Sequence, residues 1–263
     1  IESGNLEGAD HAAALANAGA AHARAGDTGA ALRDFAGALA LDDANARALE
    51  GRARILIASG QFDAAEPLVD RLIASNEAGA RAHLLQGQIA AGRSDFAAAL
   101  DAFEAAVTEE PHNVAALVGR ARMKEALSDS DGALSDFDAA IRIDPHAAEA
   151  RAGRCWLALN QDNGGGERDD TRAREDADEA VARAPQDFNA QTCRGILQLR
   201  ASQWEDAKLS FDAALAIQPG DALALFGRGV ARRRGGDGAG LTDMNQARDF
   251  NRHIGERFDQ LGV

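Results

Sequence analysis

The chain has 263 residues and carries 42 acidic against 28 basic side chains, for a formal net charge of -14. This charge excludes a surface that grips nucleic acid or anionic lipid along its whole length, because both are polyanions. Hydrophobic residues make up 46% of the sequence, which excludes a disordered acidic chain and is enough to bury a sizeable core. The aromatic residues are ten Phe and two Trp, and this small number favours a helical array built on small residues over a single globular core.

Other features bear on the environment of the protein. No apolar run approaches the roughly 18 residues of a membrane-spanning helix, so we expect no membrane segment. The sequence begins at Ile1 and not at Met, which indicates processing or truncation and leaves the compartment open between cytoplasm and periplasm. The preference for Arg over Lys and the abundance of Ala are typical of a bacterial source. Cys155 and Cys193 allow at most one disulfide, and we interpret them as small, buried packing thiols.

The order of elements along the chain follows an internal repeat. Pro111 and Pro145 lie 34 residues apart in similar segments, and this register extends over nearly the whole sequence. It predicts a lead-in over 1–11, seven units over 12–252 and a capping segment over 253–263. The units begin at Ala12, Ala46, Ala80, Val114, Ala148, Phe188 and Ala222.

Each unit is predicted to form two helices joined by a short break. The break contains Gly or Ser, and Asp27, Asp95 and Asp129 stand where an Asp caps the helix that follows. In the second helix, apolar residues recur at helical spacing and form one stripe. The stripes are Ala31, Phe35 and Ala38; Ala99, Phe103 and Ala106; Ala133, Phe137 and Ala140; Ala207, Phe211 and Ala214. One hairpin cannot bury both of its faces, so neighbouring hairpins must stack.

This pattern of a 34-residue hairpin, with Ala, Phe and Ala through its second helix and Pro at its end, resembles the tetratricopeptide repeat family. The resemblance covers 12–252 and implies an all-α fold, a right-handed superhelical α-solenoid of antiparallel helix pairs. Beyond it, Ile254, Phe258 and Leu261 share one face of the segment 253–263, which is expected to form a capping helix.

Charged residues also recur at fixed positions of the repeat. An Arg follows the midpoint of the first helix, and an acid precedes the Phe of the second helix. We predict partly buried ion pairs between neighbouring units, which fix the stacking register. The expected pairs are Asp34 with Arg52, Asp136 with Arg154, and Asp176 with Arg194, whereas Arg120 and Arg228 have no such partner.

The family resemblance implies that the first helix of each pair lines a concave groove. Eight Arg stand against three Glu in these inward positions, so we expect a cationic groove in an anionic shell. The candidate partner-binding residues are Arg47, Arg54, Arg81, Leu84, Gln88, Val118, Arg122, Trp156, Asn189, Ile196 and Arg200. Trp156 is either an anchor for a partner side chain or a packing residue between repeats, and the sequence leaves both readings open.

Catalytic and cofactor sites are not expected. The six His residues have no paired ligand spacing, and neither a Walker loop nor a nucleophile elbow occurs. The acidic turn at 160–172 offers oxygen atoms to a cation, but their order does not match an EF-hand loop, so we expect neither a metal nor a cofactor.

The sequence therefore predicts a non-catalytic scaffold or adaptor that binds a protein partner as an extended peptide or a helix. The clamp of Lys and Asn that holds a C-terminal carboxylate in some family members is absent, but the forks of Arg match carboxylate and phosphate, which favours an acidic partner. The alternative is an accessory module of a larger envelope polysaccharide-synthesis, secretion or assembly machine whose catalytic or membrane part lies outside this chain. We expect a monomer, or weak self-association through the solenoid ends.

Overall fold

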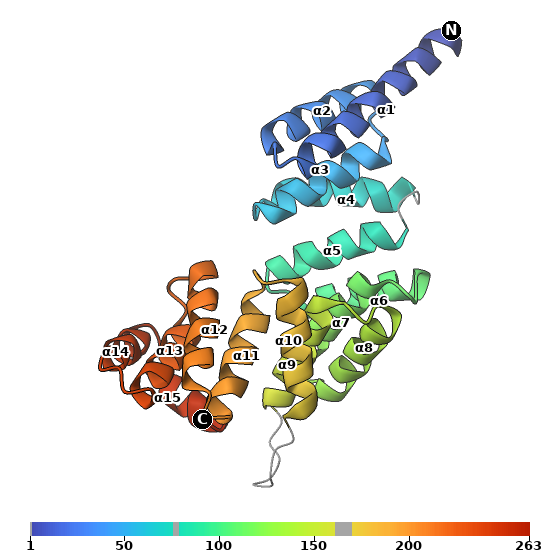
Figure 1. Cartoon of the computed structure of the whole chain (residues 1–263). Coiled ribbons are helices and arrows are strands. Elements are labelled where there is room, and N and C mark those ends of the chain that lie inside the picture. Colours follow the sequence, from blue (N-terminus) through green and yellow to red (C-terminus); the bar gives the residue numbers. More distant parts are fainter. Residues whose placement is uncertain (1, 76–78, 161–169) are drawn as a thin grey trace. The chain divides into compact units, whose positions relative to one another are not determined.

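A computed structural model describes residues 2–75, 79–160 and 170–263 of the chain, and in these ranges it contains fifteen helices and no strand (Figure 1). Side chains are described from Gly8 onward. The helices are α1 (Glu2–Arg24), α2 (Thr28–Leu41), α3 (Ala46–Ala58), α4 (Phe62–Ser75), α5 (Ala80–Gly92), α6 (Phe96–Glu109), α7 (Val114–Ala126), α8 (Ser130–Ile143), α9 (Ala148–Asn160), α10 (Thr171–Arg183), α11 (Phe188–Arg200), α12 (Trp204–Ile217), α13 (Ala222–Arg234), α14 (Gly240–Phe250) and α15 (Ile254–Gln260).

The chain forms two compact units, Ile1–Ala133 and Leu134–Val263, here called the N-terminal and C-terminal units. Within the units an odd-numbered helix packs against the even-numbered helix that follows it: α1 against α2, α3 against α4 and α5 against α6 in the N-terminal unit, and α9 against α10, α11 against α12 and α13 against α14 in the C-terminal unit. Successive odd-numbered helices also touch, as α1 touches α3 and α11 touches α13. The fold class is therefore all-α, a solenoid of antiparallel helix pairs.

The predicted apolar stripes form the core of the stack. All twelve of their residues are buried, and the exposed fraction of each is 4% or less. Room for the large ring comes from glycine on the neighbouring helices: a Cβ on Gly87 or on Gly119 would lie 2.8 Å or 2.5 Å from the Phe103 ring. Phe211 lies against Gly195 and Gly227 in the same way. The stripe prediction is confirmed, and it shows that a large residue at one position requires a small residue at another.

The breaks between paired helices share one backbone conformation. The predicted caps are confirmed, since Oδ1 of Asp27 accepts a hydrogen bond from the Ala30 amide at 2.9 Å and Asp95 and Asp129 do the same for the amide three residues later. Each described break also contains one residue with positive φ, between 60° and 89°. These residues are Gly26, Gly60 and Gly236 in three hairpins and Ser94, Ser128 and Ser202 in three others.

The predicted ion pairs are wrong in their partners, although two arginines at this position, Arg154 and Arg228, do form ion pairs. Arg154 binds Asp176 of its own hairpin, with Nε 2.6 Å from Oδ2, and its Nη1 lies 2.7 Å from Asp138 of the preceding hairpin. Arg228 repeats this pattern with Asp243 at 2.8 Å and Asp212 at 3.1 Å. The Arg therefore ties together three successive helices.

The other two expected pairs are replaced by different contacts. Asp34 receives a contact from Nδ1 of His22 at 2.7 Å, and Nε of Arg194 donates to the hydroxyl oxygen of Ser210 at 3.1 Å. The guanidinium of an Arg in the first helix can reach the second helix of its own hairpin as well as the second helix of the preceding hairpin. The repeat spacing alone therefore does not predict which acid it binds.

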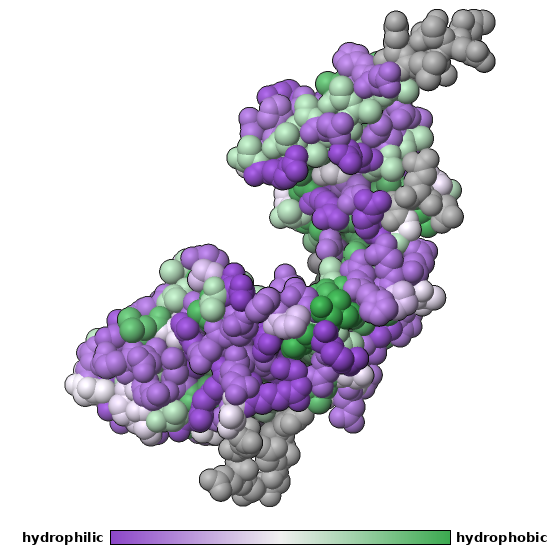
Figure 2. Space-filling view, turned by 45° about the vertical axis from the view of Figure 1, so that its right-hand side comes forward, coloured by the Kyte–Doolittle hydropathy of each residue, from purple (hydrophilic) through white to green (hydrophobic). Residues whose placement is uncertain are grey.

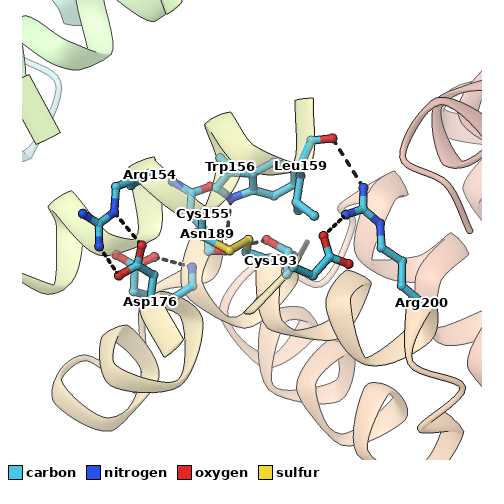
Figure 3. Close-up of a disulfide and its surroundings, with 12 residues drawn as sticks. Arg154, Cys155, Trp156, Leu159, Asp176, Asn189, Cys193 and Arg200 are labelled. Atoms are coloured by element: carbon cyan, nitrogen blue, oxygen red, sulfur yellow. Dashed lines mark hydrogen bonds and ion pairs between the residues drawn. A yellow bond between two sulfur atoms is a disulfide. The ribbon is translucent and has the colours of Figure 1, made fainter. Parts of the chain in front are cut away.

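The interpretation of the cysteines as free thiols is also wrong. Cys155 on α9 and Cys193 on α11 are joined by a disulfide, with their Cα atoms 6.4 Å apart (Figure 3). Both residues are fully buried. The bond crosslinks the first helices of two neighbouring hairpins and closes a loop of 38 residues in the C-terminal unit.

Candidate functional site

The N-terminal unit contains an open cationic cavity on the first helices of its first three hairpins. The cavity has a volume of about 370 Å³, and α1, α3 and α5 supply the residues of its rim. We call it the N-terminal arginine groove and define it by Arg24, Arg47, Glu50, Arg54 and Arg81. Its floor is small and apolar and is formed by Ala20, Ala23, Phe35, Gly51 and Ile55. Three of the predicted partner-binding residues, Arg47, Arg54 and Arg81, come together here.

Glu50 organises the groove. Its two carboxylate oxygens bind Arg54, with Nη2 at 2.8 Å, and Arg81, with Nη1 at 3.3 Å. The Arg47 guanidinium donates to the side-chain oxygen of Asn17 at 2.5 Å. The side chains of Arg54 and Arg81 remain more than half exposed, whereas only 17% of Glu50 is exposed. Four guanidinium groups and one carboxylate thus line the cavity, which leaves an excess of three positive charges and several N–H donors.

Sequence reasoning missed the roles of Asn17 and Glu50 as partners of the predicted arginines. Glu50 precedes Arg54 by four residues on one helix, and this spacing is the signal by which the pair could have been found. The contact between Glu50 and Arg81 carries no such signal, because the two residues come from different helices.

The remaining candidates of the N-terminal unit lie on α5 and α7 and differ in exposure. Leu84 and Val118 are buried, with 8% and 4% of their surfaces exposed, so they support the stack and offer little contact area. Gln88 is exposed, and Arg122 is half-buried. Burial raises the pKa of the Glu125 carboxyl, and the charge of Arg122 opposes this shift.

In the C-terminal unit, Trp156 and Asn189 lie side by side on α9 and α11 (Figure 3). The indole nitrogen of Trp156 donates a hydrogen bond to the backbone oxygen of Asn189 at 3.1 Å. Trp156 is half-buried and packs against the core, and Asn189 is exposed. The indole therefore serves packing on one side and presents a surface on the other, which combines the two readings that the sequence left open.

Ile196 and Arg200 are covered, and the C-terminal segment explains why. Ile254, Phe258 and Leu261 are buried in the same apolar cluster as Ile196, which is itself fully buried. Nε of Arg200 donates to the backbone oxygen of Leu261 at 2.7 Å. The one-sided apolar pattern of this segment is as predicted. Ile196 and Arg200, however, belong to the surface against which the segment packs and not to an open groove.

Arg200 is held by further contacts. Its Nη1 lies 2.7 Å from Oδ1 of Asp170, and only 7% of the Arg200 side chain is exposed. Arg257 of α15 donates to the side-chain oxygen of Asn160 at 2.6 Å, which fixes α15 against the end of α9. The segment after α14 thus lies across the ends of α9 and α11.

In the described part of the chain, no group of three or more His, Cys, Asp or Glu side chains is arranged to hold a metal ion. Of the acidic turn at 160–172, residues 161–169 lie outside the described residues, and Asp170 is bound to Arg200. Within the described ranges, no helix combines the length and the apolar character that crossing a membrane requires. The surface in Figure 2 is mostly hydrophilic, with small apolar patches.

Comparison with known sequences finds one family. Its description is Tetratricopeptide repeat, and it matches residues 16–77, 50–114, 84–148 and 194–240, which together span more than half of the chain. No curated protein matches the sequence.

Solved structures share the fold at low sequence identity. Pseudomonas aeruginosa pilF is 17% identical, with a TM-score of 0.66, and the match covers 84% of this chain and 96% of that one. A tetratricopeptide repeat protein from Parabacteroides merdae is 15% identical, with a TM-score of 0.61 and coverage of 97% and 100%. A chain of the APC/C hetero-tetramer Cut9-Hcn1 is 17% identical, with a TM-score of 0.66 and coverage of 88% and 45%. At these identities the likeness concerns the fold alone.

Proposed function

Because the chain belongs to the tetratricopeptide repeat family, we propose that it is a non-catalytic interaction scaffold whose N-terminal arginine groove binds an acidic partner. The partner is an extended peptide or the acidic face of a helix. Repeat modules of this family serve protein–protein interaction, and their contact residues lie on the surface of the hairpins.

The N-terminal arginine groove is the observation that carries this proposal. It combines an excess of three positive charges with an apolar floor, within a chain whose net charge is -14. The local field attracts acidic segments and their carboxylates fit the guanidinium forks, while the floor accepts small apolar side chains between the acids. Since Glu50 holds Arg54 and Arg81 in place, less side-chain freedom is lost on binding.

The experiment is a titration of the protein into two fluorescently labelled short peptides, one alternating Glu and Leu and the other alternating Lys and Leu. The variant is Arg47→Gln with Arg81→Gln, which leaves the pair of Arg54 and Glu50 intact. The variant removes two exposed ion contacts between the protein and carboxylates of the peptide, each contributing about 0.5–1 kcal/mol to the binding free energy. The affinity for the Glu peptide should therefore fall about tenfold.

The matched control is Arg33→Gln with Arg142→Gln. These two arginines are exposed, lie outside the groove and produce the same change in net charge. The control should bind the Glu peptide like the unmodified protein. Equal binding by the groove variant and the control, or equal binding of the Lys and Glu peptides, would contradict the groove as the binding site.

The second candidate function is the accessory module of an envelope or secretion machine, and the disulfide is the observation that favours it. A disulfide between buried cysteines persists in oxidising compartments such as the periplasm and is rare in the cytosol. Alkylation of thiols in intact source cells, followed by mass measurement of the denatured protein, tests this reading. Cys155 and Cys193 should resist alkylation until a reductant is added; two alkylated thiols without reductant would instead favour a cytosolic adaptor.

A further inference from the structure

A second cavity lies in the C-terminal unit, at the junction of α13, α14 and α15. Its volume is about 580 Å³, within the range of pockets that hold small ligands. Phe226, Val230, Met244, Gly255, Phe258 and Val263 line it with apolar surface, and Arg233, Arg234, Arg248 and Asp259 supply its charges. We call it the C-terminal pocket.

Arg233, Arg234 and Arg248, the three arginines of the pocket, differ from their neighbours Arg228 and Arg232 in that they form no ion pair that holds helices together among the described residues. Arg228 and Arg232 both bind the buried carboxylate of Asp243, each at 2.8 Å, and so hold α13 to α14. The pocket arginines lie in the described part of the chain and form no ion pair there. Three guanidinium groups and one acidic side chain, that of Asp259, therefore line the pocket, and these side chains carry an excess of two positive charges.

Aromatic rings hold two of these guanidinium groups without neutralising them. The Arg248 guanidinium lies 5.3 Å from the centroid of the Phe226 ring, and that of Arg234 lies 5.4 Å from the Trp204 ring. Stacking on a ring restricts the motion of an Arg side chain and keeps its N–H donors available at the edge. Phe226 in turn packs against Phe258, with centroids 4.9 Å apart. The positive charge is thus fixed beside an apolar floor.

We propose that the C-terminal pocket binds an acidic peptide segment through a carboxylate held by Arg233 and Arg248, with a neighbouring apolar side chain placed against Val230 and Val263, the half-buried apolar residues of the lining. The charge of the pocket is complementary to a carboxylate, and its apolar lining is complementary to a Leu or Phe next to it. This site shares no residue with the N-terminal arginine groove, since all of its residues belong to the C-terminal unit. The scaffold would accordingly engage acidic segments at two places.

The probe is a labelled short peptide in which Glu residues flank a single Phe, and its counterpart has Lys in place of Glu. The test variant is Arg233→Gln with Arg248→Gln, and the control is Arg142→Gln with Arg252→Gln, two exposed arginines away from the pocket. We expect the affinity for the Glu peptide to fall at least tenfold in the variant, to stay unchanged in the control and to decrease with added salt. Circular dichroism and the thermal midpoint establish that the variant is folded.

A gain-of-affinity variant makes the test independent of any loss of structure. Asp259→Asn removes the single acidic side chain that lines the pocket and should raise the affinity for the Glu peptide several-fold. The inference is overturned if Arg233→Gln with Arg248→Gln binds like its control, if Asp259→Asn has no effect, or if the Lys peptide binds equally well. If only the groove variant Arg47→Gln with Arg81→Gln loses binding, the pocket is refuted while the proposed function stands.

Discussion

Reduction of the disulfide between Cys155 and Cys193 should lower the stability of the C-terminal unit by an amount that its loop length sets. The bond closes a loop of 38 residues. In the chain-entropy model such a loop removes about 13 cal/mol/K from the unfolded ensemble, or about 4 kcal/mol at 25 °C. Measured effects are commonly about 2–4 kcal/mol, which corresponds to a fall of roughly 5–15 °C in the unfolding midpoint of a unit of this size.

The assay compares oxidised and reduced protein of unchanged sequence. Both sulfur atoms belong to fully buried residues, so the reductant is added to denatured protein, which is then refolded in its presence. Thermal unfolding is followed by circular dichroism, and alkylation under denaturing conditions counts free thiols in each sample. Reduction leaves every side chain in place except for the bond, so packing losses contribute little to the difference.

The control is the variant Cys155→Ala with Cys193→Ala, whose midpoint should not respond to the reductant. Two results would refute the reasoning. One is a pair of free thiols in protein that was prepared under oxidising conditions, and the other is equal midpoints for protein that is verified as oxidised and as reduced.

Three further substitutions test the packing and electrostatics of the array, each by chemical denaturation. Gly87→Ala places a Cβ 2.8 Å from the Phe103 ring and should destabilise the N-terminal unit by about 1–3 kcal/mol; an unchanged midpoint would mean that the ring moves freely. Asp176→Asn leaves the guanidinium groups of Arg154 and Arg151, which both bind Asp176, without their buried counter-charge and should cost about 3 kcal/mol, with partial recovery when Arg154→Met is added. The pKa of Glu125 is raised by burial, so the folded state holds its proton at a higher pH than the unfolded state, and stability falls as pH rises through this interval. Glu125→Gln should therefore stabilise the protein at pH 7 and remove the fall in stability as pH rises through this interval. A loss of stability at pH 7 in this variant would contradict the raised pKa of Glu125.

The repeated parts of the fold could be predicted from the sequence because they obey a period. A spacing of 34 residues combined with helical spacing determines which side chains face a neighbouring helix, and Phe35, Phe103, Phe137 and Phe211 are buried accordingly. Burial of a large ring among small residues is a local property of the hairpin. It therefore follows from the residues of one unit and its neighbours.

The partners of long charged side chains could not be predicted in this way. Arg154 is within reach of acids on two helices, and the choice of Asp176 and Asp138 depends on helix positions at a scale finer than the repeat. The cysteines pose the same difficulty, since their spacing of 38 residues places them on neighbouring helices without showing that their Cβ atoms face each other.

The candidate site was predicted best where only repeats contribute to it. Arg47, Arg54 and Arg81 come together because equivalent positions of successive hairpins stack, whereas Ile196 and Arg200 are covered by a segment outside the repeat. The position of α15 could not be predicted from the repeat, because this helix lies outside the 34-residue period that aligns the other helices. An amphipathic pattern predicts that such a segment is buried but not where.

The shared conformation of the breaks has a consequence for how this chain would respond to selection for heat resistance. The hairpin imposes a left-handed residue at each described break, whether that residue is Gly, as at Gly26, or Ser, as at Ser94, Ser128 and Ser202. The left-handed region costs a residue with a Cβ about 1–2 kcal/mol, whereas Gly adopts it without steric penalty. Each of the three serines therefore lowers the stability of the array relative to a Gly at the same position. Under selection for heat resistance, Ser→Gly substitutions at these positions should be among the first to appear, and their effects on the free energy of unfolding should add.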